Sequence, residues 1–209
     1  SFDTAMSIAS GTDAASVSIN RAARIGKARA LLGVGLSNAP AAAALVTAIP
    51  TTYRYDVTAS LTGGNNTLWD QAASQNRYTV ADSLSGNART IVVKNAIPFF
   101  SAHDPRVPAH YKIASNGKDT VKSQDGNTFV IQVDSLWGQT TAVAVVAGLD
   151  ARLIEAEAAL QAGNAASMMA ILNALRQAKP TIGVTTIPPM PPLATPITLE
   201  SATTLLFRE

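Results

Sequence analysis

The sequence contains no cysteine, and only 14% of its 209 residues are charged. Without cysteine the chain forms no disulfide and offers neither a thiolate nucleophile nor a thiolate metal ligand. The charged share lies well below the ~25% of typical soluble domains, so Ser, Thr, Asn and Gln must cover much of the surface, a composition common in exported proteins. The net charge of +2, with no cluster of Lys and Arg, argues against nucleic acid as a partner.

Long apolar runs and targeting signals are also missing. No run of ~18 apolar residues occurs, so no segment is expected to span a bilayer as a helix. The chain opens with Ser1-Phe2-Asp3 in a segment typical of a mature protein, without a signal peptide.

Catalytic motifs are absent as well: the sequence has no GxSxG, HExxH, P-loop or GxGxxG pattern. Glu155 and Glu157 lie two residues apart on a predicted helix and project to different faces, so they do not form an acid/base pair. We expect them to pack against arginines of the neighbouring helix and to be solvated. The sequence therefore predicts neither an enzyme nor a cofactor site, although catalytic residues assembled from distant positions would leave no motif.

The two histidines, His103 and His110, flank Asp104 in a proline-rich loop. A zinc site needs three or four converging ligands with supporting hydrogen bonds, and the local sequence supplies no others. We therefore expect no metal here. A structural role for this loop is the alternative that we favour.

Residues 149–179 predict two amphipathic helices separated only by Ala162-Gly163-Asn164. Apolar residues recur on one face of each helix at spacings of three and four. They are Leu149, Leu153, Ala156 and Leu160 in the first helix, and Met168, Ile171, Leu172 and Leu175 in the second. Gly163 suits the left-handed cap of the first helix, and Asn164 suits the N-cap of the second. A break this short predicts an antiparallel helical hairpin.

The N-terminal part predicts a second helical pair over residues 13–50. Asp13 is a suitable N-cap for a helix that continues to about Leu32, and a shorter helix is expected from Ala39 to Ile49. The first of these helices has a basic side, which we interpret as a solvated face rather than a binding site for an anionic partner. The residues of that side are Arg21, Arg24, Lys27 and Arg29.

Residues 51–147 have a different character, with polar turns, prolines and only short apolar runs. Alternation predicts a half-buried strand at 53–57, and further strands are expected at 89–94 and 128–133. A short apolar run at 142–147 leads into the helix at 149. Residues 180–198 carry five prolines between Ile187 and Ile197, so they predict an extended connector, and a further helix begins near Leu199.

Several short segments, taken in order, resemble the SusD/RagB family of outer-membrane lipoproteins. The Ala156-Glu157-Ala158 helix that ends in Ala162-Gly163-Asn164, followed by Leu172-Asn173-Ala174-Leu175-Arg176, is similar to the family's last tetratricopeptide-type pair. Asp104-Pro105-Arg106 resembles a turn found mid-chain in the family, and residues 205–209 resemble the opening of a later helix.

The pattern and this resemblance together predict a mainly α protein. Its tetratricopeptide-like helical pairs would enclose a loop-rich insertion that carries a few short strands. Residues 1–209 would then be one SusD-like domain: a helical pair at 13–50, the insertion at 51–147, a second pair at 149–179, the connector at 180–198 and the start of a helix at 199–209. The family's lipidated N-terminal cysteine would lie upstream of Ser1, so we expect the chain to be an internal fragment.

The resemblance implies non-catalytic capture of an oligosaccharide or another nutrient on the extracellular face of a bacterial outer membrane. The family delivers its ligand to a TonB-dependent, SusC-like transporter, and membrane attachment would be only through the lipid anchor. The alternative is a helical scaffold that binds a protein partner or self-assembles, with no small ligand. The first function predicts aromatic residues exposed together on one concave surface, and the second predicts them buried.

Aromatic residues are few, at 5% of the chain, yet most of the tyrosines and both tryptophans lie in the irregular middle region. Aromatic faces beside polar side chains suit stacking on sugar rings, although each ring alone could equally pin a loop to the scaffold. We expect Trp69 and Trp137 to be exposed, and Tyr55 and Tyr78 to lie in the core. The predicted ligand-binding residues are Trp69, Trp137, Tyr53, Asn66, Asp70 and Arg77.

Overall fold

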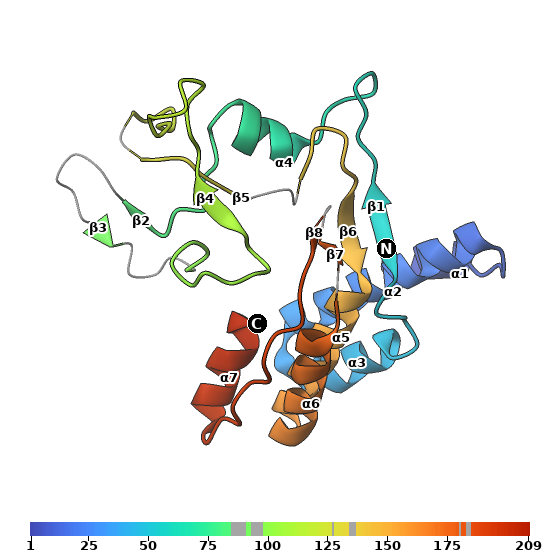
Figure 1. Ribbon diagram of the computed structural model, residues 1–209. Coiled ribbons are helices and arrows are strands. Elements are labelled where there is room, and N and C mark those ends of the chain that lie inside the picture. Colours follow the sequence, from blue (N-terminus) through green and yellow to red (C-terminus); the bar gives the residue numbers. More distant parts are fainter. Residues whose placement is uncertain (85–90, 93–97, 127, 134–136, 180, 183–184) are drawn as a thin grey trace. The chain divides into compact units, whose positions relative to one another are not determined.

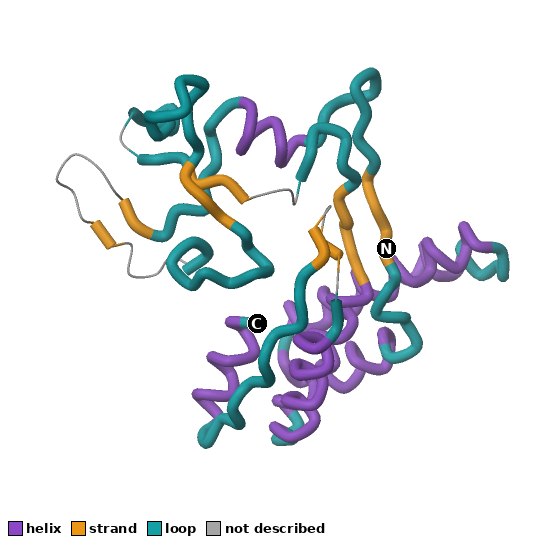
Figure 2. Tube along the Cα trace, viewed as in Figure 1, coloured by secondary structure: helices purple, strands orange, loops and turns teal. Residues whose placement is uncertain are grey.

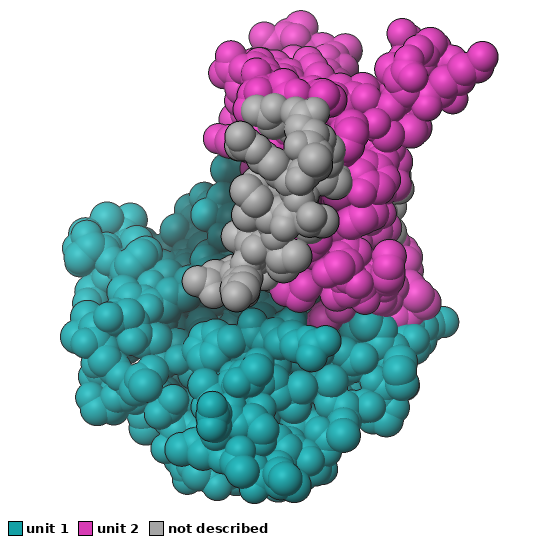
Figure 3. All heavy atoms as spheres, turned by 90° about the vertical axis from the view of Figure 1, so that its left-hand side faces the viewer, with its two compact units in different colours: residues 1–57, 144–179, 189–209 teal, residues 58–143, 180–188 magenta. Residues whose placement is uncertain are grey.

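The computed structural model describes residues 1–84, 91–92, 98–126, 128–133, 137–179, 181–182 and 185–209. The chain divides into two compact units, coloured separately in Figure 3. Unit 1 comprises residues 1–57, 144–179 and 189–209, and unit 2 comprises residues 58–143 and 180–188. Most helical residues belong to unit 1, whereas the described part of unit 2 is mainly loops and short strands (Figure 2).

Four of the helices of unit 1 begin at a polar side chain that caps the first turn. Its helices are α1 (Phe2–Ile8), α2 (Ala14–Val34), the 3₁₀ turn η1 (Leu36–Asn38), α3 (Ala39–Val46), α5 (Gly148–Gln161), α6 (Ala165–Gln177) and α7 (Leu199–Arg208) (Figure 1). The Asp13 carboxylate accepts a hydrogen bond from the Ser16 amide at 3.0 Å, and the Asn164 side chain accepts one from the Ser167 amide at 3.0 Å. Gly163 has φ 73°, the left-handed conformation in which glycine carries no steric cost. The predicted caps of α2 and α6 and the helical hairpin α5–α6 are thereby confirmed.

Helix α5 takes part in both hydrophobic clusters of unit 1. Its N-terminal half contributes Ala151 and Ile154 to a cluster with α2 and α3. Its C-terminal half contributes Ala156 and Leu160 to a second cluster with α6 and α7. Because Ala151 and Ala156 are fully buried and small, neighbouring helices approach α5 closely on both sides.

A pair of short strands, β1 (Arg54–Val57) and β6 (Val143–Ala147), leads from α3 and into α5. The strand predicted at 53–57 is confirmed as β1, but all four of its residues are exposed, so the prediction that it is half-buried is wrong. Tyr53, directly before β1, is buried instead, and its hydroxyl donates a hydrogen bond to the Ser18 carbonyl oxygen at 2.6 Å.

Unit 2 contains a three-residue helical turn, α4 (Thr67–Trp69), that continues as the π-type turn η2 (Asp70–Ser74). Its described strands are β2 (Ser83–Leu84), β3 (Ile91–Val92), β4 (Ala109–Tyr111), β5 (Ile131–Val133), β7 (Thr181–Ile182) and β8 (Thr185–Thr186). They form antiparallel pairs, β2 with β3, β4 with β5 and β7 with β8, and His110 lies opposite Gln132 in the second pair. Most of the strand predicted at 89–94 lies outside the described residues.

Aromatic packing and one threonine support the β4–β5 pair. The Tyr111 ring contacts Phe100 and Phe129 edge-on, with ring centroids 5.2 and 6.1 Å apart. The Thr79 hydroxyl accepts a hydrogen bond from the Ile131 amide at 2.8 Å, and the Val80 amide donates to the Ile131 carbonyl oxygen at 3.2 Å. Residues 79–80 therefore lie alongside β5.

The predicted turn at Asp104-Pro105-Arg106 is confirmed. The Oδ1 atom of Asp104 accepts hydrogen bonds from the backbone amide of Arg106 at 2.8 Å and from the Nε atom of the Arg106 side chain at 2.9 Å. The Nη2 atom of Arg106 donates to the Oδ2 atom of Asp104 at 2.7 Å. Among the described residues, no group of three or more His, Asp or Glu side chains is arranged to hold a metal ion.

The mainly α, tetratricopeptide-like fold class is wrong. The described residues contain eight short strands in four two-stranded pairs beside the helices, which makes the protein mixed α/β. The N-terminal helical pair is also unmatched in length, since α2 has 21 residues and α3 has 8, whereas α5 and α6 have 14 and 13. Helical periodicity is confined to the two ends of the sequence, and the β-branched runs between them are too short and too closely interrupted by turns to continue it.

Acid is expected to destabilise unit 2 through Asp82, which is 8% exposed and accepts hydrogen bonds from the Ser101 amide at 2.8 Å and the Ser101 hydroxyl at 2.6 Å. Burial raises the pKa of Asp82, but the hydrogen bonds from Ser101 and nearby backbone amides outweigh it and bring the pKa below 3.8. A lowered folded-state pKa means that this stabilisation is complete above the unfolded-state value and is lost as the pH falls through the lower, folded-state value. Asp82→Asn should cost about 1.5 kcal/mol at pH 7.

The measurement is urea unfolding followed by tryptophan fluorescence, because both tryptophans lie in unit 2. The difference in stability between wild type and Asp82→Asn should shrink between pH 4 and the acid limit. A difference that is the same at pH 3 as at pH 7 contradicts this assignment.

Candidate functional site

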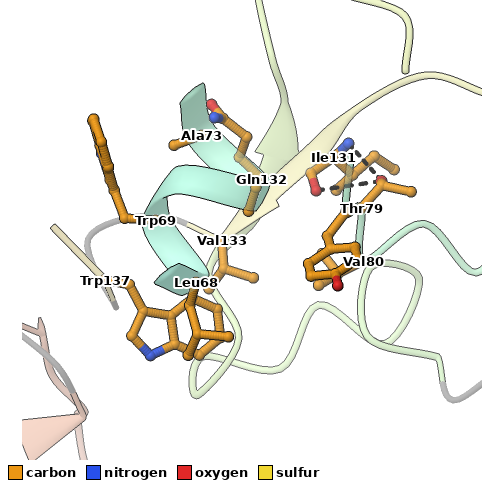
Figure 4. Close-up of a pocket in the computed structure, with 11 residues that line it drawn as sticks. Leu68, Trp69, Ala73, Thr79, Val80, Ile131, Gln132, Val133 and Trp137 are labelled. Carbon is orange, nitrogen blue, oxygen red and sulfur yellow. Dashed lines mark hydrogen bonds between the residues drawn. The ribbon is translucent and has the colours of Figure 1, made fainter. Parts of the chain in front are cut away.

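Unit 2 contains a cavity of about 210 Å³ between the helical turn α4–η2, residues 78–80 and strand β5. Its walls are mainly apolar side chains and aromatic rings. The lining residues are Leu68, Trp69, Ala72, Ala73, Tyr78, Thr79, Val80, Ile131, Gln132, Val133 and Trp137. In Figure 4, Leu68 and Trp69 project from the helical turn, and Ile131, Gln132 and Val133 project from β5.

The structure brings the two predicted tryptophans to this one cavity. Trp69 and Trp137 are both half-buried, so the prediction that they are exposed is wrong. Tyr78, predicted to lie in the core, is 60% exposed and lines the same cavity. Tyr55 is 38% exposed, so its predicted core position is also wrong. The cavity thus presents three aromatic side chains.

Asn66 positions the helical turn and does not line the cavity. It is 3% exposed, and its side-chain oxygen accepts hydrogen bonds from the amides of Leu68 at 2.9 Å and Trp69 at 3.3 Å. Its side-chain amide donates to the Thr141 carbonyl oxygen at 2.9 Å. Asn66 therefore caps α4 and ties it to the segment after Trp137, which orients both tryptophans.

Two further groups hold the other end of the turn. Asp70, at the start of η2, accepts from the Gln75 side chain at 2.5 Å. The Lys112 ammonium donates to the Ala73 carbonyl oxygen at 2.5 Å and to the Asn76 side chain at 2.7 Å. Burial lowers the pKa of Lys112. Neither residue lines the cavity: Lys112 binds the backbone of the turn at Ala73, whereas the Asp70 carboxylate binds the Gln75 side chain.

The remaining predicted site residues lie elsewhere. Tyr53 belongs to the core of unit 1, and Arg77 is exposed and outside the cavity lining. Four further lining residues were not predicted, namely Leu68, Val80, Ile131 and Val133. The alternation at 128–133 places Ile131 and Val133 on one face of a strand, but it does not show what lies opposite that face.

The cavity walls are mainly apolar and carry a few polar groups. None of its described lining residues is Asp, Glu, His or Lys, so the walls offer no carboxylate, imidazole or amine for proton transfer. The polar groups are the Thr79 hydroxyl, the Gln132 amide, the Tyr78 hydroxyl and the indole N–H groups. An apolar site with a few polar groups holds a ligand by shape and orients it by hydrogen bonds.

Among the described residues, no helix combines the length and apolarity needed to cross a membrane. Compared with protein-family profiles, with curated proteins and with solved structures, the chain shows no significant match.

Proposed function

We propose that this chain is a non-catalytic binding protein whose unit 2 cavity takes one ring of an oligosaccharide or of another nutrient with an apolar face. The observation that carries the proposal is that Trp69 and Trp137 both line one apolar cavity and that each is only partly buried. A helical scaffold without a small ligand predicts these rings to be buried.

The size and polarity of the cavity support a single ring. Its volume of about 210 Å³ lies below the ~300–1,000 Å³ range typical of small-molecule sites, so we expect it to take no more than one ring. One pyranose ring can stack its C–H-rich face on an indole while its hydroxyls form hydrogen bonds with polar lining groups such as Gln132 and Tyr78. The other units of the oligosaccharide would then extend into water.

The family resemblance extends the proposal to a location and a partner. The resemblance rests on Asp104-Pro105-Arg106 and on residues 149–179. On that basis we propose that the protein acts on the extracellular face of a bacterial outer membrane and delivers its ligand to a TonB-dependent, SusC-like transporter. Binding and transfer, without bond-making, are consistent with cavity walls that carry no carboxylate, imidazole or amine.

Replacing either tryptophan by alanine should weaken glycan binding at least about tenfold. Removing an indole face eliminates a stacking contact and its buried area, together worth about 1.5–2 kcal/mol. A glycan array first selects the tightest ligand, and calorimetric titration then compares wild type with Trp69→Ala and Trp137→Ala. Trp137→Phe should recover part of the affinity because an aromatic face is restored.

Tyr55→Ala is the matched control, because Tyr55 is an exposed aromatic residue of unit 1 outside the cavity. The Tyr55→Ala variant should bind the selected glycan with the same affinity as wild type. Flat binding of wild type across the whole array, or equal losses in Tyr55→Ala and Trp137→Ala, would refute the proposal.

A further inference from the structure

Unit 1 contains a second cavity, of about 400 Å³, between helices α2, α5 and α7. This volume lies within the ~300–1,000 Å³ range of small-molecule sites. The cavity combines apolar walls with four charged side chains. Its lining residues are Arg29, Leu32, Asp150, Leu153, Ile154, Glu157, Leu206, Phe207 and Glu209.

Three of these charged groups are already paired. The Arg29 Nη2 atom donates to the Asp150 Oδ1 atom at 2.8 Å, while the other oxygen of Asp150 accepts from the Ala147 amide at 2.6 Å. Both carboxylate oxygens of Glu209 accept from Arg176, at 2.9 and 2.8 Å. These interactions compensate the charges of Arg29, Asp150 and Glu209 within unit 1.

Glu157 is the exception among the charged lining residues. It forms no hydrogen bond or ion pair with any part of the chain that the structure describes, and Leu153 and Ile154 line the cavity beside it. Burial raises the pKa of its carboxyl group, with no other cause acting on it. The prediction that Glu157 packs against an arginine of the neighbouring helix is not supported by an ion pair, since Arg29 of α2 pairs with Asp150 and Arg152 pairs with Glu155 on α5 itself. A half-buried carboxylate without a partner costs folding free energy.

We propose that this cavity binds a small organic cation, with its ammonium or guanidinium group paired to Glu157 and its apolar body against Leu206 and Phe207. The unpaired negative charge selects the sign of the ligand, and a charge-assisted hydrogen bond would satisfy the carboxylate. Phe207 is 72% exposed at the cavity, so its ring is available to contact the ligand body or to face a cation. This site does not depend on the function proposed for unit 2.

Calorimetric titration with 2-phenylethylamine and with 2-phenylethanol tests the proposal. The two probes share an apolar body and differ in charge, so wild type should bind the amine at least about tenfold more tightly. Glu157→Gln should remove that preference and leave the weak binding of the alcohol unchanged. Phe207→Ala should weaken the binding of both probes by a similar factor, because it removes an apolar wall of the cavity and keeps the charge of Glu157.

Glu200→Gln is the matched control, because Glu200 is an exposed glutamate of α7 that does not line the cavity. It carries the same change of charge and should bind the amine as wild type does. Trp137→Ala should also leave amine binding unchanged, which separates this site from the unit 2 cavity.

Stability supplies a readout that a merely structural glutamate would not give. Because the folded-state pKa of Glu157 is raised, the charged form costs stability above that pKa, and the cost disappears as the pH falls below the unfolded-state value near 4.5. The Glu157→Gln variant keeps the other charged residues that line the cavity, which are Arg29 from α2, Asp150 from α5 and Glu209 from α7. This variant should therefore have a higher melting temperature than wild type at pH 7, and the difference should shrink at pH 4.

Three results would overturn the proposal. They are absence of amine binding in wild type, equal binding of the amine and the alcohol, and retention of the amine preference in Glu157→Gln. A lower melting temperature of Glu157→Gln at pH 7 would equally show that the carboxylate has a partner in the folded protein.

Discussion

Replacing Gly148 by alanine is expected to destabilise unit 1 by about 3 kcal/mol, the upper end of the cost of overpacking. Gly148 is the first residue of α5, and a Cβ atom there would lie 2.1 Å from the Pro50 carbonyl oxygen and 2.5 Å from that of Thr51. These are backbone atoms, so no side-chain rotation relieves the contact. The Gly148 amide also donates to the Tyr53 carbonyl oxygen at 2.8 Å, a bond that the displacement of α5 would break.

Gly33→Ala is the matched control. Gly33 lies in α2, and a Cβ atom at this position meets nothing within 4 Å. Since alanine favours helix over glycine, this variant should gain about 0.5–1 kcal/mol. Urea unfolding followed by far-ultraviolet circular dichroism measures both variants. If the two substitutions change the unfolding free energy by equal amounts, the close approach at Gly148 does not exist in solution.

The helical parts of the fold could be predicted because their signals are local. Asp13 and Asn164 cap helices through amides three residues away, and Gly163 supplies the left-handed residue that ends α5. Each interaction is contained within one helical turn of sequence, so spacing and residue type suffice to find it. The apolar stripe of α6 is equally local, and Met168 and Leu172 from that stripe are buried.

The requirement at Gly148 could not be predicted, because it comes from the chain about 100 residues earlier. No local pattern around residue 148 indicates that the carbonyl groups of Pro50 and Thr51 lie close to it. The choice among the tyrosines failed for the same reason. Tyr53 is buried, and its hydroxyl donates a hydrogen bond to the carbonyl oxygen of Ser18 on helix α2. Tyr55 and Tyr78 are both exposed.

The candidate site was predicted in part. Trp69 and Trp137 were selected as aromatic residues in a polar region, and both line the unit 2 cavity. Asn66 was predicted to bind the ligand because it lies close to Trp69 in the sequence, but it caps the helical turn instead. Its position directly before the turn was sufficient to indicate this role. The opposite wall, from Ile131 and Val133, depends on how β5 lies beside residues 79–80, which no local pattern specifies.

The error in fold class has a related cause. Eight short strands leave only faint traces in sequence, because a strand of two or three residues is too short to display alternation. The structure also shows why the C-terminal pattern was informative. Helix α5 supplies both hydrophobic clusters of unit 1, so most of its positions are constrained to be small or apolar.

Replacing Arg152 by alanine is expected to cost about 3 kcal/mol, the second large effect. Arg152 lies on α5, and its Nη2 atom donates to three carbonyl oxygens at and beyond the C-terminus of α3, those of Val46, Thr47 and Ile49, at 3.1, 3.4 and 3.1 Å. Its Nη1 atom pairs with Glu155 at 2.9 Å, and both side chains are largely buried, at 21% and 16% exposed. The substitution removes the Arg152 donor from the Thr47 and Ile49 carbonyl oxygens and from the Glu155 carboxylate, whereas the Val46 carbonyl oxygen still accepts from the Ile49 amide at 2.9 Å. Unsatisfied groups of this kind cost about 1–3 kcal/mol each before relaxation and water compensate part of the loss.

A double-mutant cycle with Glu155→Ala separates the two contributions. If the ion pair matters, Arg152→Ala and Glu155→Ala together should destabilise by less than the sum of the single losses, because the double variant leaves no unpaired carboxylate. Arg152→Lys should recover only a small part, since one ammonium cannot reach the carbonyls of α3 and Glu155 at once. Arg208→Ala, which removes an exposed arginine of α7, should change the unfolding free energy by no more than about 0.5 kcal/mol. Additive single losses would show that Arg152 acts only through the end of α3.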